Sequence, residues 1–210
     1  MLTEFLTSAI VTLLVTLDPP GLAPIFLSVT LGMNAGERKR VAIRASLIAF
    51  GIMVFFAVGG DALLRALGIS LPAFRISGGI LLFTIAFEMV FELRSKRKTT
   101  TAEIAITEDH IHNVAAFPLA IPLMAGPGTI TAVILLAGRA GSSLPLVLIL
   151  AGVIAVVVLS CLAMFLMAER VSRWLGITGN VVLTRLLGVI LAALAIQFVI
   201  DGIKQVMAGG

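Results

Sequence analysis

The sequence is poor in charged residues, in cysteine and in polar aromatic residues. Only 12% of its 210 residues are charged, tyrosine is absent, and there is one cysteine and one tryptophan. A soluble domain carries about 25% charged residues, so this composition, with a mean hydropathy of +1.16, excludes an ordinary soluble protein. The single cysteine, Cys161, excludes a disulfide framework, and its place inside an apolar run predicts a packing role.

Two function classes are also excluded. The net charge is +4, but the cations lie in short segments between apolar runs, without the aromatic side chains that stack on bases, so we predict no nucleic-acid partner. Serine and threonine residues lack the base and orienting group of a nucleophilic triad. We therefore predict that the protein is not an enzyme and needs no cofactor.

Long apolar runs dominate the chain instead. Each is long enough to cross a hydrocarbon layer, which needs about 20 helical residues. The runs cover residues 4–30, 41–64, 72–93, 114–138, 144–168 and 180–207. The sequence thus predicts an all-α membrane protein with six transmembrane helices. No basic region precedes the first run, so we expect it to be a retained span and not a signal peptide.

Lysine and arginine residues between the runs predict the orientation. If the N-terminus lies outside, ten of them fall on the inner side and four on the outer side. The inner set is Arg38, Lys39, Arg40, Arg44, Arg94, Lys96, Arg97, Lys98, Arg170 and Arg173, and the outer set is Arg65, Arg75, Arg139 and Lys204. The positive-inside rule then predicts a prokaryotic inner (plasma) membrane protein with both termini outside the cytoplasm.

The first run contains a helix break. Residues 17–24 read Leu-Asp-Pro-Pro-Gly-Leu-Ala-Pro, with one carboxylate, three prolines and a glycine. Proline removes a backbone donor, so carbonyls near Leu14, Val15 and Pro20 are expected to lose their usual partners. Lipid offers no hydrogen bonds, so such a break survives only inside protein or beside a wet cavity. That makes it a candidate site.

The two halves of the chain resemble one another. Residues 61–70 align with residues 169–178, Gly79 with Gly188, and Pro20-Gly21 with Pro127-Gly128, at offsets of 107 to 109. Because each copy has three spans, an odd number, the second copy enters the membrane from the face opposite to the first. The two halves are therefore predicted to be inverted repeats of the kind found in secondary transporters. The expected organisation is a first repeat at 1–93, a cytoplasmic linker at 94–113 and a second repeat at 114–210.

The fourth run is also interrupted, by three prolines and two glycines between residues 117 and 131. We expect discontinuous first and fourth helices whose restarting halves meet near the centre, where helix starts attract anions and helix ends attract cations. A small zwitterion fits such a place. The predicted substrate-binding residues are Thr16, Asp18, Pro20, Gly21, Gly126, Gly128, Thr129 and Thr131. The competing interpretation is that both breaks are packing kinks.

Several ionisable or polar residues could take part in substrate binding or in coupling. Asp18 could bind a substrate ammonium, a coupling Na+ or a proton, and it could also cap the restarting helix. The candidates for coupling or gating are Asp18, Arg75, Arg185 and Gln197, although the arginines could equally be interfacial anchors. His110 and His112 lack the further ligands of a metal site, so no metal is predicted.

These motifs resemble the MarC family over the whole chain. The resemblance is carried by residues 18–26, by Pro122–Ile130, by Arg75-Ile76-Ser77-Gly78-Gly79, and by Arg185-Leu186-Leu187-Gly188 with Gln197-Phe198. It implies a six-span inner-membrane protein related to amino-acid exporters, with small neutral amino acids bound between the first and fourth spans. Many members of the family have Asn where this chain has Asp18, which weakens a proton role for Asp18.

The sequence therefore predicts a secondary transporter of small neutral amino acids, such as glycine or alanine, that works by rocking of the inverted repeats. A homo-oligomer is compatible with this prediction. Two alternatives stay open: an exporter of another solute, such as a drug, a metal or a metabolite, and a membrane protein without transport activity whose breaks are only kinks.

Overall fold

A computed structural model describes residues 2–94, 97–100, 114–141 and 143–208 of the protein. All regular structure in these ranges is helical, as the sequence predicts. Five helices are long and apolar enough to cross a membrane, and a sixth span is present if two bent helices are taken together. The protein is thus an all-α, multi-pass integral membrane protein.

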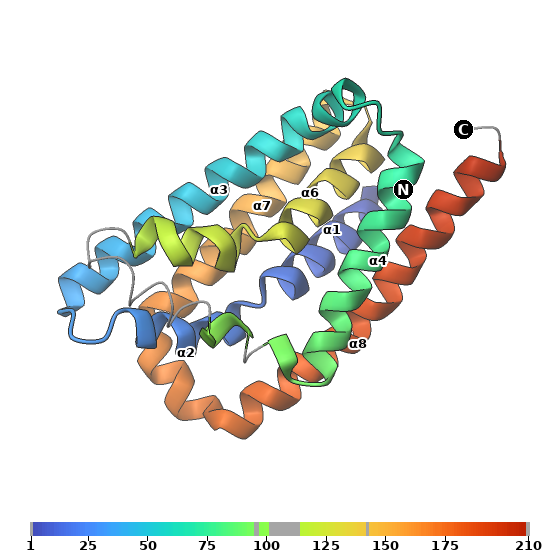
Figure 1. The fold of residues 1–210 in the computed structure, drawn as a ribbon. Helices are drawn as coiled ribbons and strands as arrows, with labels where there is room; N and C mark the ends of the chain where they lie inside the picture. Colours follow the sequence, from blue (N-terminus) through green and yellow to red (C-terminus); the bar gives the residue numbers. More distant parts are fainter. Residues whose placement is uncertain (1, 95–96, 101–113, 142, 209–210) are drawn as a thin grey trace.

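The helices follow the predicted runs closely (Figure 1). Their bounds are α1 Leu2–Leu17, α2 Pro19–Val29, α3 Ala35–Ala66, α4 Leu71–Val90, η1 Ala115–Met124, α6 Pro127–Ala140, α7 Leu144–Leu166 and α8 Ala168–Met207. The N-terminal ends of two helices, α3 and α4, are determined by local capping residues. Asn34 and Glu37 form a reciprocal capping box at the start of α3, and Ser70 caps α4 just before Pro72.

Helices far apart in the sequence pack side by side. The helix α4 runs along α8 at one side of the molecule, and α3 packs against α7 and α6 (Figure 1). Small residues allow the first of these contacts, because Gly79 faces the backbone oxygen of Ala195 and Gly188 faces Met89. Helices approach this closely in membranes where one side chain is missing.

The long helix α8 has a break near its start. Gly176 adopts φ 61° and ψ −177°, a conformation that suits glycine, and the apolar span begins only at Thr178. Residues 168–175 form a first segment that turns away from the rest of α8 (Figure 1). This segment carries Glu169, Arg170, Arg173 and Trp174, so it has the composition of an interfacial helix.

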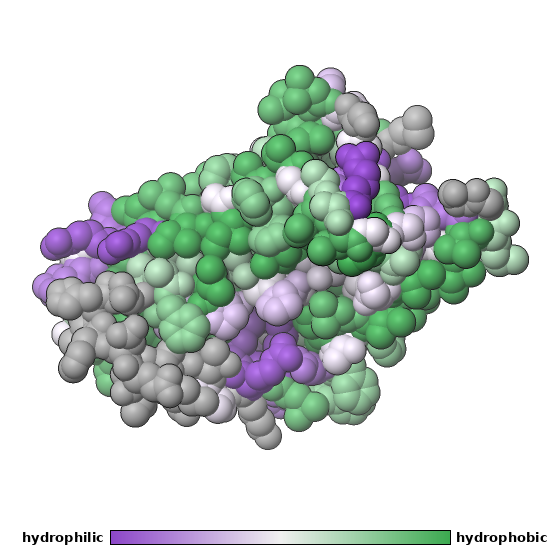
Figure 2. Space-filling model, turned by 45° about the horizontal axis from the view of Figure 1, so that its top comes forward, coloured by the Kyte–Doolittle hydropathy of each residue, from purple (hydrophilic) through white to green (hydrophobic). Residues whose placement is uncertain are grey.

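The molecular surface matches a membrane environment. In Figure 2 hydrophobic residues cover most of the visible face, and the hydrophilic residues at its left edge lie over the start of α3. Large apolar side chains such as Phe55, Val58 and Leu148 are more than half exposed. In water they would be costly, whereas in lipid they contact the acyl chains.

Candidate functional site

The first break lies at Asp18, between α1 and α2. Asp18 has left-handed backbone angles (φ 58°, ψ 64°), and its carboxylate Oδ1 accepts a hydrogen bond of 3.2 Å from the Gly21 backbone N–H. The capping role inferred from the sequence is therefore confirmed. A Cβ at position 21 would overlap the Asp18 carboxylate, so any larger residue there would displace this carboxylate. Asp18 is only 3% exposed.

Not every backbone carbonyl that was expected to lose its hydrogen bond at this break does so. Leu14 keeps its partner, because its oxygen accepts a 2.9 Å bond from the Asp18 backbone N–H. The expectation for Leu14 was wrong, since a proline frees the carbonyl four residues earlier, which for Pro20 is that of Thr16. The guanidinium of Arg94 donates to this Thr16 oxygen through Nη2. The break is thus held by a cation from another part of the chain.

A second cation reaches Asp18 itself. Lys98 Nζ lies 3.7 Å from Asp18 Oδ2, and the side chains are 9% and 4% exposed. This ammonium makes no hydrogen bond to the described residues. A buried ammonium can donate three hydrogen bonds, so Lys98 has spare capacity for an acceptor.

The second break separates η1 from α6. The irregular, π-helical η1 contains Phe117 and Ile121 in extended conformation, and it is bent by 57° relative to α6. Gly126 precedes α6 without any side-chain cap, and Pro127 is the first residue of the helix. The first N–H groups of a helix have no partner inside it, so this buried end offers donors to an acceptor from outside.

A cavity of about 290 Å³ lies at this helix end. It brings together the start of α6, two apolar residues of α4 and the cations that follow α4. The lining residues are Leu81, Ile85, Arg94, Arg97, Lys98, Pro122, Leu123, Gly126, Pro127, Gly128 and Thr129. The cavity therefore combines backbone donors and positive charge with apolar side chains.

Three of the predicted binding residues line this cavity: Gly126, Gly128 and Thr129. Thr16 lies next to it, because a Cβ on Gly128 would come within 3.7 Å of Thr16 Cγ2. Thr16 of the first break thus lies close to Gly128 of the second. Asp18 is not among the lining residues, but it forms an ion pair with Lys98, which lines the cavity.

Three other predicted residues lie outside the cavity. Pro20 lines a separate cavity of about 400 Å³ between α2 and α8. Thr131 is turned toward α4, where its methyl group faces Gly78. The Gly21 backbone N–H is already used by Asp18.

The structure pairs the coupling candidates with other residues. The buried Arg75 guanidinium points to the Gly138 oxygen at 3.5 Å, while Gln197 donates to Asp201 at 2.8 Å. Arg185 makes an ion pair of 3.0 Å with Glu92. Among the described residues, Asp18 forms its ion pair with Lys98 and not with any of these three.

Arg94 and Lys98 are the site residues that sequence reasoning missed. Both fall in the segment predicted to be a linker, yet they are only 6% and 8% exposed. Their spacing of four residues gave a weak signal, because it places two cations on one helical face. Arg97 pairs with Glu88 at 2.9 Å. The remainder of that linker, residues 101–113 with His110 and His112, lies outside the described residues.

Burial determines the charge state of Lys98. Loss of hydration, followed by repulsion from Arg94, lowers the pKa of Lys98 to about 7, although Asp18 opposes the shift. An incoming anion would favour the charged form.

Within the described ranges no cluster of three His, Cys, Asp or Glu side chains could hold a metal ion.

Comparisons with known proteins agree with this architecture. Residues 3–207 match the MarC family integral membrane proteins. The chain is 38% identical to a UPF0056 membrane protein of Aquifex aeolicus, over 95% of this chain and 92% of that protein. It is 36% identical to the UPF0056 membrane protein YhcE of Escherichia coli, over 91% and 88% of the two chains. No solved structure matches significantly.

Proposed function

The chain belongs to the MarC family of integral membrane proteins, and we propose that it is a secondary transporter of small neutral amino acids. The observation that carries this proposal is the cavity at the start of α6. An uncapped helix start, Thr129 and the Lys98 ammonium converge there, and together they suit a carboxylate. The volume of about 290 Å³ suits a small molecule.

The amino group of the substrate has a complementary place. The end of α1 presents backbone carbonyls, and Asp18 adds a carboxylate. Arg94 and Lys98 contact these groups in the structure. A substrate ammonium would compete with both cations for them, so we propose that the side chains of Arg94 and Lys98 shift when substrate enters.

Helix packing supports the inverted repeat. Each predicted pair of equivalent spans is in direct contact: α1 with α6, α3 with α7, and α4 with α8. Such pairing is expected when two inverted halves surround a common axis. Gly79 and Gly188, which align in the two halves, both lie in the α4–α8 contact. We infer that α1–α2 and η1–α6 are the discontinuous first helices of the two halves.

Uptake of labelled glycine and alanine tests the proposal. Purified protein in proteoliposomes is expected to accumulate both above protein-free vesicles, and leucine should compete poorly because the cavity is small. Lys204→Met, at an exposed position near the C-terminus, is the matched control and should transport normally. Absence of uptake for every neutral amino acid would refute the proposal.

The pKa of Lys98 predicts a pH dependence of substrate affinity. Because the empty site has a Lys98 pKa of about 7 and a bound carboxylate raises it, binding takes up a proton above that pH. Affinity for glycine should be constant below about pH 7 and fall by up to tenfold per pH unit above it. Isothermal titration between about pH 6 and about pH 8.5 measures this. An affinity that rises with pH would contradict the assignment.

An exporter of a different solute is the second candidate. A bulky drug needs a wide aromatic surface, whereas the apolar part of this cavity is formed by few side chains, Leu81, Ile85 and Leu123 among them. A metal ion would need carboxylate, imidazole or thiolate ligands, and this cavity is lined by cations. Thermal stabilisation by amino acids would separate the first candidate from this one.

A further inference from the structure

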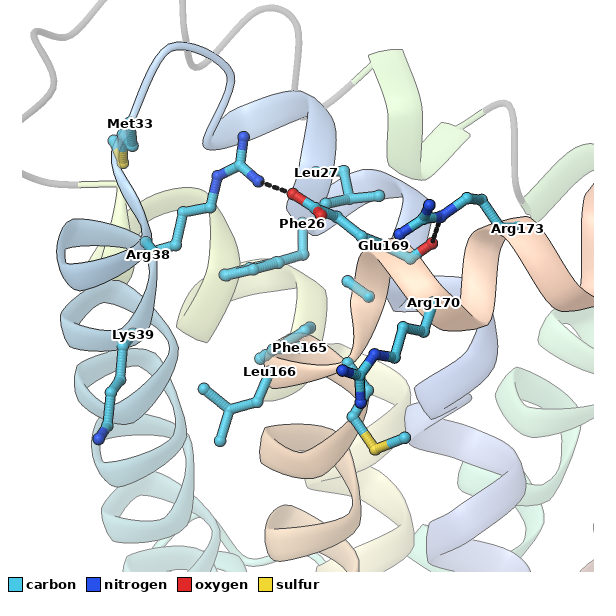
Figure 3. A pocket seen from close by; sticks show the side chains of 13 residues that line it. Phe26, Leu27, Met33, Arg38, Lys39, Phe165, Leu166, Glu169, Arg170 and Arg173 are labelled. Carbon is cyan, nitrogen blue, oxygen red and sulfur yellow. Dashed lines mark hydrogen bonds and ion pairs between the residues drawn. The ribbon is translucent and has the colours of Figure 1, made fainter.

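A larger cavity lies at one end of the helix bundle, away from the two breaks. Its volume is about 710 Å³, and it opens where the start of α3 and the junction of α7 with α8 diverge (Figure 3). By the positive-inside rule, this end is expected to face the cytoplasm. We call it the basic pocket, and its side chains are of two kinds, cationic and apolar.

The basic pocket carries an excess of positive charge. Four cations line it, two from α3 (Arg38 and Lys39) and two from α8 (Arg170 and Arg173), against a single carboxylate. That carboxylate, Glu169, is already paired with Arg38 at 2.5 Å. Among the described residues, the side chains of Arg170 and Lys39 have no hydrogen-bond or ion-pair partner. In addition, Arg38 Nε is buried without a hydrogen-bond partner. Among the described residues that line the pocket, the positive charges thus exceed the negative ones by three.

The floor of the basic pocket is apolar. The rings of Phe26 and Phe165 stack there with centroids 4.7 Å apart, between the cations of α3 and those of α8 (Figure 3). Beside them Leu166 and Met167 are about half exposed, at 52% and 49%. A second hollow adjoins the pocket and shares Met167, Arg170 and Arg173 with it. A ligand of this surface needs an anionic part and an apolar part.

The location relative to the membrane matches that requirement. The cations of α8 lie on its first segment, which precedes the break at Gly176 and the apolar span. Trp174 of the same segment is 89% exposed, and tryptophan gathers at the height of lipid headgroups. Leu166 is the last residue of the α7 span. The pocket therefore sits at the boundary between headgroups and acyl chains.

We propose that the basic pocket binds an anionic phospholipid of the phosphatidylglycerol type. Its phosphate would lie among Arg38, Arg170 and Arg173, where planar guanidinium groups donate paired hydrogen bonds to phosphate oxygens. One acyl chain would run over Leu166 and Met167 and fill the apolar floor. Basic pockets at helix ends select anionic lipids in this way. The site is independent of the cavity at α6 and of any transport.

The test compares lipids and variants by native mass spectrometry and thermal stability of the detergent-purified protein. Phosphatidylglycerol should bind and raise the melting temperature, whereas phosphatidylethanolamine should do so much less. The double variant Arg170→Gln/Arg173→Gln should weaken phosphatidylglycerol binding by about tenfold or more. The matched control Arg65→Gln/Lys204→Gln removes two exposed cations elsewhere and should bind as the wild type does.

Three results would overturn the proposal. Equal binding of the two lipids would show that the headgroup charge is not recognised. Unchanged binding in the double variant, with a wild-type elution profile, would place the lipid elsewhere. Stabilisation by inorganic phosphate as large as that by phosphatidylglycerol would assign the pocket to a free anion. If the double variant proves unstable, Leu166→Gln tests the acyl-chain contact and should weaken lipid binding alone.

Discussion

Replacing Lys98 with methionine is expected to raise the KM for glycine by about 30-fold or more. The ammonium is buried, lines the cavity and has spare donors for a carboxylate. Loss of one partner of a buried charged pair costs about 2–5 kcal/mol, and 2 kcal/mol corresponds to about 30-fold in affinity. Methionine has a similar length and no charge, so it fills the same space, and Arg94 remains as a counter-charge for Asp18. Uptake rates over a range of glycine concentrations measure the effect.

The controls for this variant separate binding from folding. Lys98→Arg keeps a cation and should recover part of the affinity, while Lys204→Met should behave as the wild type. Lys98→Met should also remove the fall in affinity above pH 7, because that fall is assigned to Lys98. A variant with normal KM and normal pH dependence would exclude Lys98 from the site, even if glycine transport itself were established.

Replacing Asp18 with alanine is expected to cause the largest loss of stability. The change removes the cap of α2, which is worth about 1 kcal/mol. It also leaves Lys98 and Arg94 buried without their counter-charge, and breaking a buried pair costs about 3–5 kcal/mol. The melting temperature in detergent should fall sharply, and much of the protein should be lost during purification.

Asparagine at the same position isolates the charge from the cap. Asp18→Asn can still accept from the Gly21 N–H, and asparagine tolerates the left-handed angles of residue 18. It should therefore be more stable than Asp18→Ala. The exposed pair of Asp61 with Arg65 provides the comparison, because Asp61→Ala should cost at most about 1 kcal/mol. Equal stability of Asp18→Ala and Asp61→Ala would refute the role of Asp18 as a buried counter-ion.

The spans and the helix ends next to Asp18 and Gly126 could be predicted because their signals are local. Apolar length defines a span, and Asp18-Pro19-Pro20 or Gly126-Pro127-Gly128 interrupts a helix wherever it occurs. The identity of the freed carbonyl was also within reach, since counting four residues back from Pro20 gives Thr16. The structure agrees with that count and not with the expectation for Leu14.

The role of Arg94 and Lys98 could not be derived in this way. Between two apolar runs, a cation is most simply a solvated loop residue, and nothing local indicates burial. Arg94 meets Thr16 across 78 positions of sequence, so the contact depends on how the chain folds back after α4. The left-handed Glu92, with φ 65°, marks that turn. Only tertiary structure shows which loop cations enter the bundle.

The contact between Arg94 and Thr16 has a consequence for dividing the chain. Arg94 binds the break between α1 and α2, and Arg94 and Lys98 line the same cavity as the start of α6. A fragment that stops at residue 93 would lose both Arg94 and Lys98. If the two halves are expressed as separate polypeptides, the chain should be divided after Thr100. The first fragment then keeps the contacts of Arg94 with Thr16 and of Lys98 with Asp18.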